Sequence, residues 1–156
     1  MGKDVYVVIE QRDGHVQKVG LELIGEARKL AGELGQQVTA VILGDQVADK
    51  AGLLYQYGAE RVIAIEHPLL KEYATEPYAK GLTQAIREYE PEIVLFGATS
   101  IGRDLAPRVA ARIHTGLTAD CTGLDIDPET KLLRMTRPAF GGNIMATIIC
   151  PHYRPQ

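Results

Sequence analysis

The chain has 156 residues, a formal net charge of −3 and 24% charged residues, with no basic stripe. These values are typical of one globular domain and argue against disorder and against nucleic-acid binding. The apolar runs fall far short of the roughly 20 residues of a membrane span. No signal-peptide hydrophobic region precedes the first predicted strand, and two cysteines in a chain of this length are typical of reduced thiols. We therefore expect a cytoplasmic protein.

Short apolar runs alternate with helical periodicity up to Gly116. The predicted strands are residues 5–9, 38–43, 61–65 and 93–96. The predicted helices are residues 19–34, 47–57, 75–89 and 103–114. The strands are apolar on both faces, as buried parallel strands are. The order predicts a doubly wound, mostly parallel α/β sheet with right-handed crossovers, of the Rossmann-like or adenine-nucleotide-hydrolase-like kind.

The pattern changes after Gly116. Residues 117–127, 131–136 and 143–150 have the pattern of strands joined by turns. They are expected to add one or two strands, at least one of them antiparallel, to the edge of the sheet. The whole of residues 1–150 is thus predicted to form a single α/β domain, and residues 151–156 the start of a linker.

The first candidate site is the turn between the strand 93–96 and the helix that follows. Residues 97–100 are Gly-Ala-Thr-Ser and are predicted to lie at the carboxyl edge of the sheet, where ligands and partners dock. Small residues let backbone N–H groups approach an anion closely, but the lysine of a Walker A loop is missing. Ser100 has two interpretations: a helix cap or a neighbour of the cap, or a hydroxyl that lines a nucleotide or flavin contact.

The second candidate site is residues 136–143, Thr-Arg-Pro-Ala-Phe-Gly-Gly-Asn. Pro138 cannot donate to a strand ladder, and the two glycines permit a sharp reversal. Arg137 is therefore predicted at a strand end beside a tight turn. Either it is a surface arginine paired with a carboxylate, or it offers its planar donors and fixed charge to a phosphate or a flavin ring.

Side-chain sets for catalysis are not found in the sequence. The four histidines lack the spacing of metal ligands, so we predict no metal site. Ser100 has no neighbouring histidine or aspartate that would make it a nucleophile, and Cys121 has no cationic neighbour in sequence. We expect no catalytic residue in this chain.

Three stretches together carry a family resemblance: residues 5–10, residues 97–112 with 115–121, and residues 136–143. In these stretches the chain resembles the N-terminal domain of the α subunit of electron transfer flavoproteins, and the match spans essentially the whole chain. The resemblance implies an electron carrier rather than an enzyme. Such proteins are heterodimers with a β subunit that carry electrons from dehydrogenases to an acceptor, or, in bifurcating members, divide the two electrons of NADH between acceptors.

The resemblance also implies cofactors and an interface. The family's α subunits hold the electron-carrying FAD in a C-terminal domain, so FAD is expected in the intact complex and not in this chain alone. The β subunit holds AMP, or a second FAD in bifurcating members, and Arg137 is expected to face that second flavin. The residues expected at the interface with the β subunit are Thr136, Phe140, Gly141, Gly142 and Asn143.

Two alternatives remain at this point. One is a stand-alone adenine-nucleotide-binding domain of the universal-stress-protein kind, with the turn at Gly97 holding phosphate. The other is an ATP-pyrophosphatase-like enzyme, which is disfavoured because residues 10–14 do not form the Ser-Gly-Gly-x-Asp-Ser type of loop that it needs.

Overall fold

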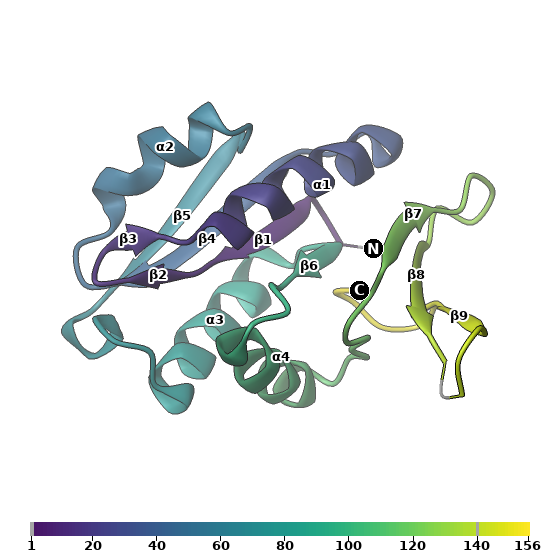
Figure 1. Ribbon diagram of the computed structural model, residues 1–156. Coiled ribbons are helices and arrows are strands. Elements are labelled where there is room, and N and C mark those ends of the chain that lie inside the picture. Colours follow the sequence, from purple (N-terminus) through teal and green to yellow (C-terminus); the bar gives the residue numbers. More distant parts are fainter. Residues whose placement is uncertain (1, 140) are drawn as a thin grey trace.

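A parallel sheet lies at the centre of the computed structural model, which describes residues 2–139 and 141–156 (Figure 1). Its strands are β1 (Val5–Ile9), β4 (Val38–Gly44), β5 (Arg61–Glu66) and β6 (Ile93–Leu95). They pair in the order β5-β4-β1-β6, and every pair is parallel. The doubly wound α/β class predicted from the sequence is confirmed.

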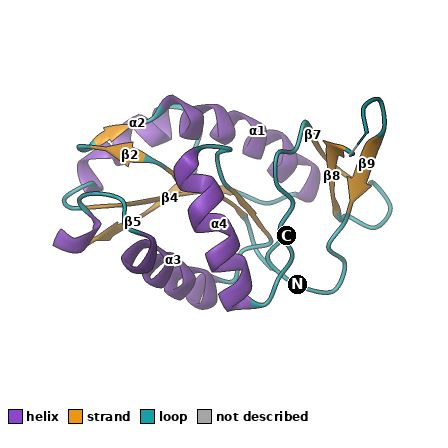
Figure 2. Cartoon of the chain, turned by 60° about the horizontal axis from the view of Figure 1, so that its bottom comes forward, coloured by secondary structure: helices purple, strands orange, loops and turns teal. Residues whose placement is uncertain are grey.

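Helices cover both faces of this sheet (Figure 2). They are α1 (Lys18–Leu34), α2 (Ala51–Gln56), α3 (Thr75–Tyr89) and α4 (Ser100–Ile113), with short 3-10 turns η1 (Ala48–Lys50) and η2 (Pro68–Leu70). Helices α1 and α2 lie on one face, and α3 and α4 lie on the other. A small hairpin, β2 (Gln11–Arg12) and β3 (His15–Val16), follows β1 and turns at Asp13 and Gly14.

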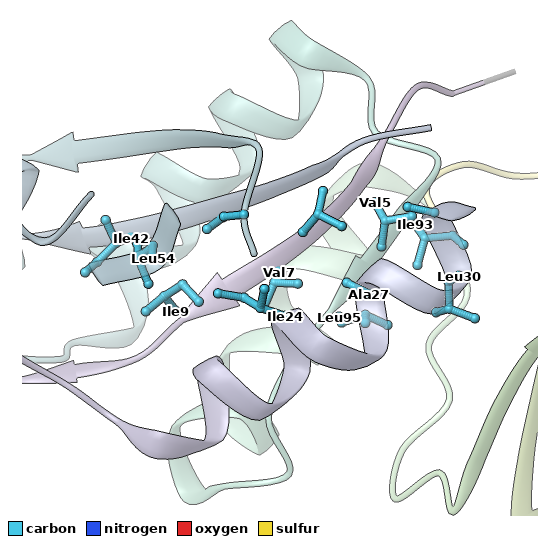
Figure 3. Close-up of a cluster of buried hydrophobic side chains, with 14 of the residues drawn as sticks. Val5, Val7, Ile9, Ile24, Ala27, Leu30, Ile42, Leu54, Ile93 and Leu95 are labelled. Atoms are coloured by element: carbon cyan, nitrogen blue, oxygen red, sulfur yellow. The ribbon is translucent and has the colours of Figure 1, made fainter. Parts of the chain in front are cut away.

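The two helical layers give the sheet two hydrophobic cores. Val7 of β1 packs in one core with Ile24 of α1, as Figure 3 shows. Its neighbour Val8 packs in the other core with Leu105 of α4. Successive side chains of a strand point to opposite faces, so a strand covered on both sides must be apolar throughout. The continuous apolar runs in the sequence have this cause.

Helix α4 begins earlier than the sequence pattern predicts. It starts at Ser100 instead of residue 103, and its N-cap is Thr99, which has extended backbone angles. The Thr99 Oγ1 accepts a hydrogen bond from the N–H of Gly102 at 3.0 Å. Ser100 is thus the neighbour of the cap and not the cap itself.

The chain after α4 departs from the prediction. Strands β7 (Gly123–Ile126), β8 (Leu133–Pro138) and β9 (Met145–Ile148) form a separate antiparallel sheet in the order β7-β8-β9, here called the arm (Figure 1). The expectation that these segments extend the edge of the parallel sheet is wrong, and residues 117–122 are not in a strand. Sequential strands joined by short turns pair with one another, and the arm contacts the body through apolar side chains, Ile126, Leu133 and Met135, that join the α1 core.

Candidate functional site

Arg137 lies near the end of β8, opposite Ala146 of β9, and its side chain is half-buried. Arg134 on the same strand makes a two-pronged contact with Asp125, with nitrogen–oxygen distances of 2.8 and 3.0 Å. Arg137 forms no such ion pair with any residue that the structure describes. Of the two interpretations of Arg137, pairing with a carboxylate is not seen among the described residues, whereas an interaction with another group stays a prediction.

The turn after Arg137 is as tight as its glycines predict. The N–H of Ala139 donates to the C=O of Ile144 at 2.7 Å and closes the hairpin between β8 and β9. Gly141 and Gly142 have φ angles of 100° and 111°, and residues other than glycine rarely adopt such angles. Both are exposed, as is Asn143. Phe140 lies outside the described residues.

Thr136 has a structural role in the arm. It lies opposite Gly123 of β7 and Thr147 of β9, and its C=O accepts a hydrogen bond from the N–H of Thr122 at 2.8 Å. Its half-buried side chain can still be part of an interface.

A chain of charges connects the arm to the start of α4. Arg137 lies close enough to Cys121 to lower the pKa of its thiol, although burial has the larger effect and the pKa is raised overall. The residue before Cys121, Asp120, forms an ion pair with Arg103 of α4 at a nitrogen–oxygen distance of 3.2 Å. Sequence reasoning found no cation near Cys121, because Arg137 reaches it only through the folding of the arm.

The turn at Gly97 has a carboxyl group beneath it. Thr99 Oγ1 donates to Glu10 Oε1 at 2.6 Å, and Glu10 Oε2 is buried with no hydrogen-bond partner among the described residues. A Cβ added at Gly97 would lie 3.0 Å from this second oxygen. An ionised carboxylate presents only acceptors and repels anions, so it suits a phosphate poorly.

Glu10 was missed by the sequence analysis. The signal was present, because Glu10 directly follows the first strand, and β1 and β6 are the neighbours between which the strand order reverses. Ser100 is exposed and makes no side-chain hydrogen bond to a described residue, so no bonded contact links it with Arg137.

An apolar groove of about 420 Å³ lies between the body and the arm. It is lined by α1, by β6, by α4, by residues 115–121 and by the inner side of the arm. Its charged lining residues in the described part of the chain are Arg103 and Asp120, which pair with each other. The groove thus suits an apolar occupant better than a charged one.

Within residues 2–139 and 141–156, no group of three or more His, Cys, Asp or Glu side chains could hold a metal ion. No helix in the same residues is long and apolar enough to cross a membrane.

Comparisons with known proteins agree on one family. A model of the electron transfer flavoprotein domain matches residues 5–156. The chain is 55% identical over 154 residues to the electron transfer flavoprotein subunit alpha of Thermoanaerobacterium thermosaccharolyticum and 52% identical over 154 residues to that of Clostridium acetobutylicum, covering 99% of this chain and 46% of each relative. It is 49% identical over 175 residues to the acryloyl-CoA reductase electron transfer subunit beta of Anaerotignum propionicum, covering 98% of this chain and 48% of that protein. The chain spans about half the length of these relatives.

Proposed function

Because the chain belongs to the electron transfer flavoprotein domain family, we propose that it works as the N-terminal domain of an α subunit in an electron-carrying complex. In that complex it pairs with a β subunit and serves dehydrogenases and an acceptor. In this proposal the domain contributes to the assembly of the complex and to the electrostatic environment of a flavin site. It contributes no catalytic residue. The alternative of a stand-alone adenine-nucleotide domain has no support in the comparisons, and the carboxyl group of Glu10 beneath the Gly97 turn speaks against phosphate there.

The main support for the proposal is that the guanidinium of Arg137 has no ion-pair partner in the described part of the chain. A flavin supplies the electron chemistry when it is bound. The fixed positive charge and planar donors of Arg137 suit the anionic form of a reduced flavin. In this proposal the flavin is the second FAD of the β subunit, and in complexes whose β subunit holds AMP the same group faces the nucleotide.

The surface around the hairpin suits a protein partner. Ile144 and Met145 are 64% and 52% exposed, and Ile149 is 47% exposed. Large exposed apolar side chains in and beside β9 are typical of a surface that another protein covers. We assign this surface, with Thr136, Gly141, Gly142 and Asn143, to the contact with the β subunit.

The reduction potentials of the flavins in the full heterodimer test this proposal. The Arg137→Ala substitution removes a cation that favours the anionic reduced form, so the potential of the β-subunit flavin falls while that of the α-subunit FAD stays in place. Arg137→Lys retains the positive charge, so the potential of the β-subunit flavin is expected to fall less than in Arg137→Ala. Arg134→Ala is the matched control, because Arg134 lies on the same strand and is occupied by Asp125. Unchanged potentials for both flavins in the Arg137→Ala complex contradict the assignment.

The flavin content of the 156-residue chain gives a second test. In this proposal the contacts that hold the electron-carrying FAD lie in another part of the α subunit. The chain on its own is expected to purify colourless. A preparation with a stoichiometric flavin spectrum would show that these residues hold FAD by themselves.

A further inference from the structure

The acidic side chains of the arm are held by an arginine other than Arg137. Residues 115–150 contain four acidic residues, Asp120, Asp125, Asp127 and Glu129. Arg134 interacts with two of them, at nitrogen–oxygen distances of 2.8 Å to Asp125 and 3.7 Å to Asp127. Glu129 lies in the turn between β7 and β8, at the other end of β8 from Arg137. Asp120 is therefore the acid of this segment that could pair with Arg137.

Asp120 and Arg137 lie on neighbouring stretches of backbone. The N–H of Thr122 donates to the C=O of Thr136 at 2.8 Å, so the residues just before β7 run beside the end of β8. Both charges act on Cys121: burial has the largest effect and raises the pKa of the thiol, Arg137 lowers this pKa and Asp120 raises it. The two opposite charges are thus close to the same thiol, yet the carboxylate of Asp120 binds Arg103 instead.

Two features favour a carboxylate beside α4. Arg103 lies close to the beginning of this helix, which starts at Ser100, and its guanidinium is 3.2 Å from Asp120 Oδ1. The N-terminal end of a helix also carries a partial positive charge that attracts an anion. Asp120 has a φ of 55°, a left-handed conformation that aspartate adopts more readily than most residues. The ion pair and the helix end together hold Asp120 at α4.

We propose that Arg103 is a positioning residue for Arg137: by binding Asp120, it leaves the guanidinium of Arg137 free for the cofactor of the partner subunit. The identity of that cofactor rests on the proposed function, whereas the competition between the two arginines for Asp120 takes place within this chain. Without Arg103, the carboxylate of Asp120 is expected to turn to Arg137. Exposed ion pairs favour the closed form by up to about five-fold. The population of Arg137 with a free guanidinium is expected to fall by up to about this factor in Arg103→Ala.

NMR of arginine side chains in the 156-residue chain tests the competition. The Nε–Hε signal of Arg137 is assigned by its loss in Arg137→Lys. Pairing with Asp120 is expected to slow rotation of the Arg137 guanidinium in Arg103→Ala. The rotation is expected to return to its original rate when Asp120→Ala is added. Arg108→Ala is the matched control, because Arg108 also lies on α4 and pairs with Glu76 at 3.1 Å.

The potential of the β-subunit flavin in the full heterodimer tests the consequence. Arg103→Ala is expected to lower this potential in the same direction as Arg137→Ala, by a smaller shift. Addition of Asp120→Ala is expected to restore it. In the Arg137→Ala background, Arg103→Ala is expected to cause no further fall, because its effect requires the Arg137 side chain.

Three outcomes overturn the proposal. An unchanged rotation rate of the Arg137 guanidinium in Arg103→Ala would show that Asp120 does not turn to it. Equal effects of Arg103→Ala with and without Asp120→Ala would indicate that the ion pair only tethers residues 115–122 to α4. A further fall of the potential in the Arg137→Ala background would indicate a direct effect of the Arg103 charge on the flavin. Slowed rotation in Arg103→Ala with unchanged potentials in Arg137→Ala would instead support the competition and contradict the flavin contact of the proposed function.

Discussion

The N-cap of α4 gives the sharpest prediction about this fold, because one hydroxyl serves two buried groups. Thr99 Oγ1 accepts from the N–H of Gly102 at 3.0 Å and donates to Glu10 Oε1 at 2.6 Å. The other oxygen of Glu10 already lacks a partner among the described residues. The Thr99→Ala substitution therefore removes the cap and leaves the buried carboxyl group with no hydrogen bond from this side.

The expected loss of stability has two parts. Removal of a threonine N-cap costs about 1 kcal/mol. An acceptor that stays buried without its donor costs about 1–3 kcal/mol more. The free energy of unfolding is thus expected to fall by about 2–4 kcal/mol, which lowers the melting temperature of a chain of this size by roughly 4–16 °C.

Urea unfolding of matched variants measures this loss. Thr99→Ser keeps the hydroxyl and is expected to lose less than about 1 kcal/mol. Ser100→Ala is the positional control, because Ser100 is exposed and has no side-chain hydrogen bond to a described residue, so its change stays within about 0.5 kcal/mol. A double-mutant cycle of Thr99→Ala with Glu10→Ala isolates the coupling between the two side chains. The reasoning fails if Ser100→Ala costs as much as Thr99→Ala, or if the cycle shows no coupling.

Two further predictions concern the same region and the arm. A Cβ at Gly102 would collide with the carbonyl oxygen of Gly97, so Gly102→Ala is expected to lower the free energy of unfolding by about 1–3 kcal/mol. Gly32 has open space around it, so Gly32→Ala is expected to raise the free energy of unfolding by roughly 0.5–1 kcal/mol in the same urea titration. Burial raises the pKa of Cys121 and Arg137 opposes that rise, so Arg137→Ala is expected to raise this pKa further and to slow iodoacetamide alkylation of Cys121 at a given pH. An unchanged pH profile of alkylation would show that the guanidinium does not act on the thiol.

The sequence could predict the parallel body because burial on both faces leaves a local signal. Helix α3 begins at Thr75 and ends at Tyr89, as the periodicity predicts. The predicted helix 19–34 ends where α1 does, and its C-cap is Gly35, with a φ of 66°. These features depend on residues close in sequence. The spacing of apolar residues and the glycines at helix ends therefore predict them.

The position of the arm could not be predicted in this way. The apolar runs after Gly116 indicate strands, but period-two alternation does not say which sheet a strand joins. Whether Arg137 forms an ion pair could not be predicted from local pattern either. The position of Arg137 near a strand end follows from Pro138 and the glycines. That it lacks an ion pair among the described residues depends on the register of β7 and β8, because this register places Asp125 opposite Arg134.

The alternation of side chains along β8 relates the apolar groove to Arg137. Leu133 and Met135 point to one face and line the groove, and two residues further along Arg137 shares that face. Arg134 points to the other face with Asp125. The arm is joined to the body by apolar packing and not by strand pairing, so the position of Arg137 relative to the body depends on what supports Leu133 and Met135.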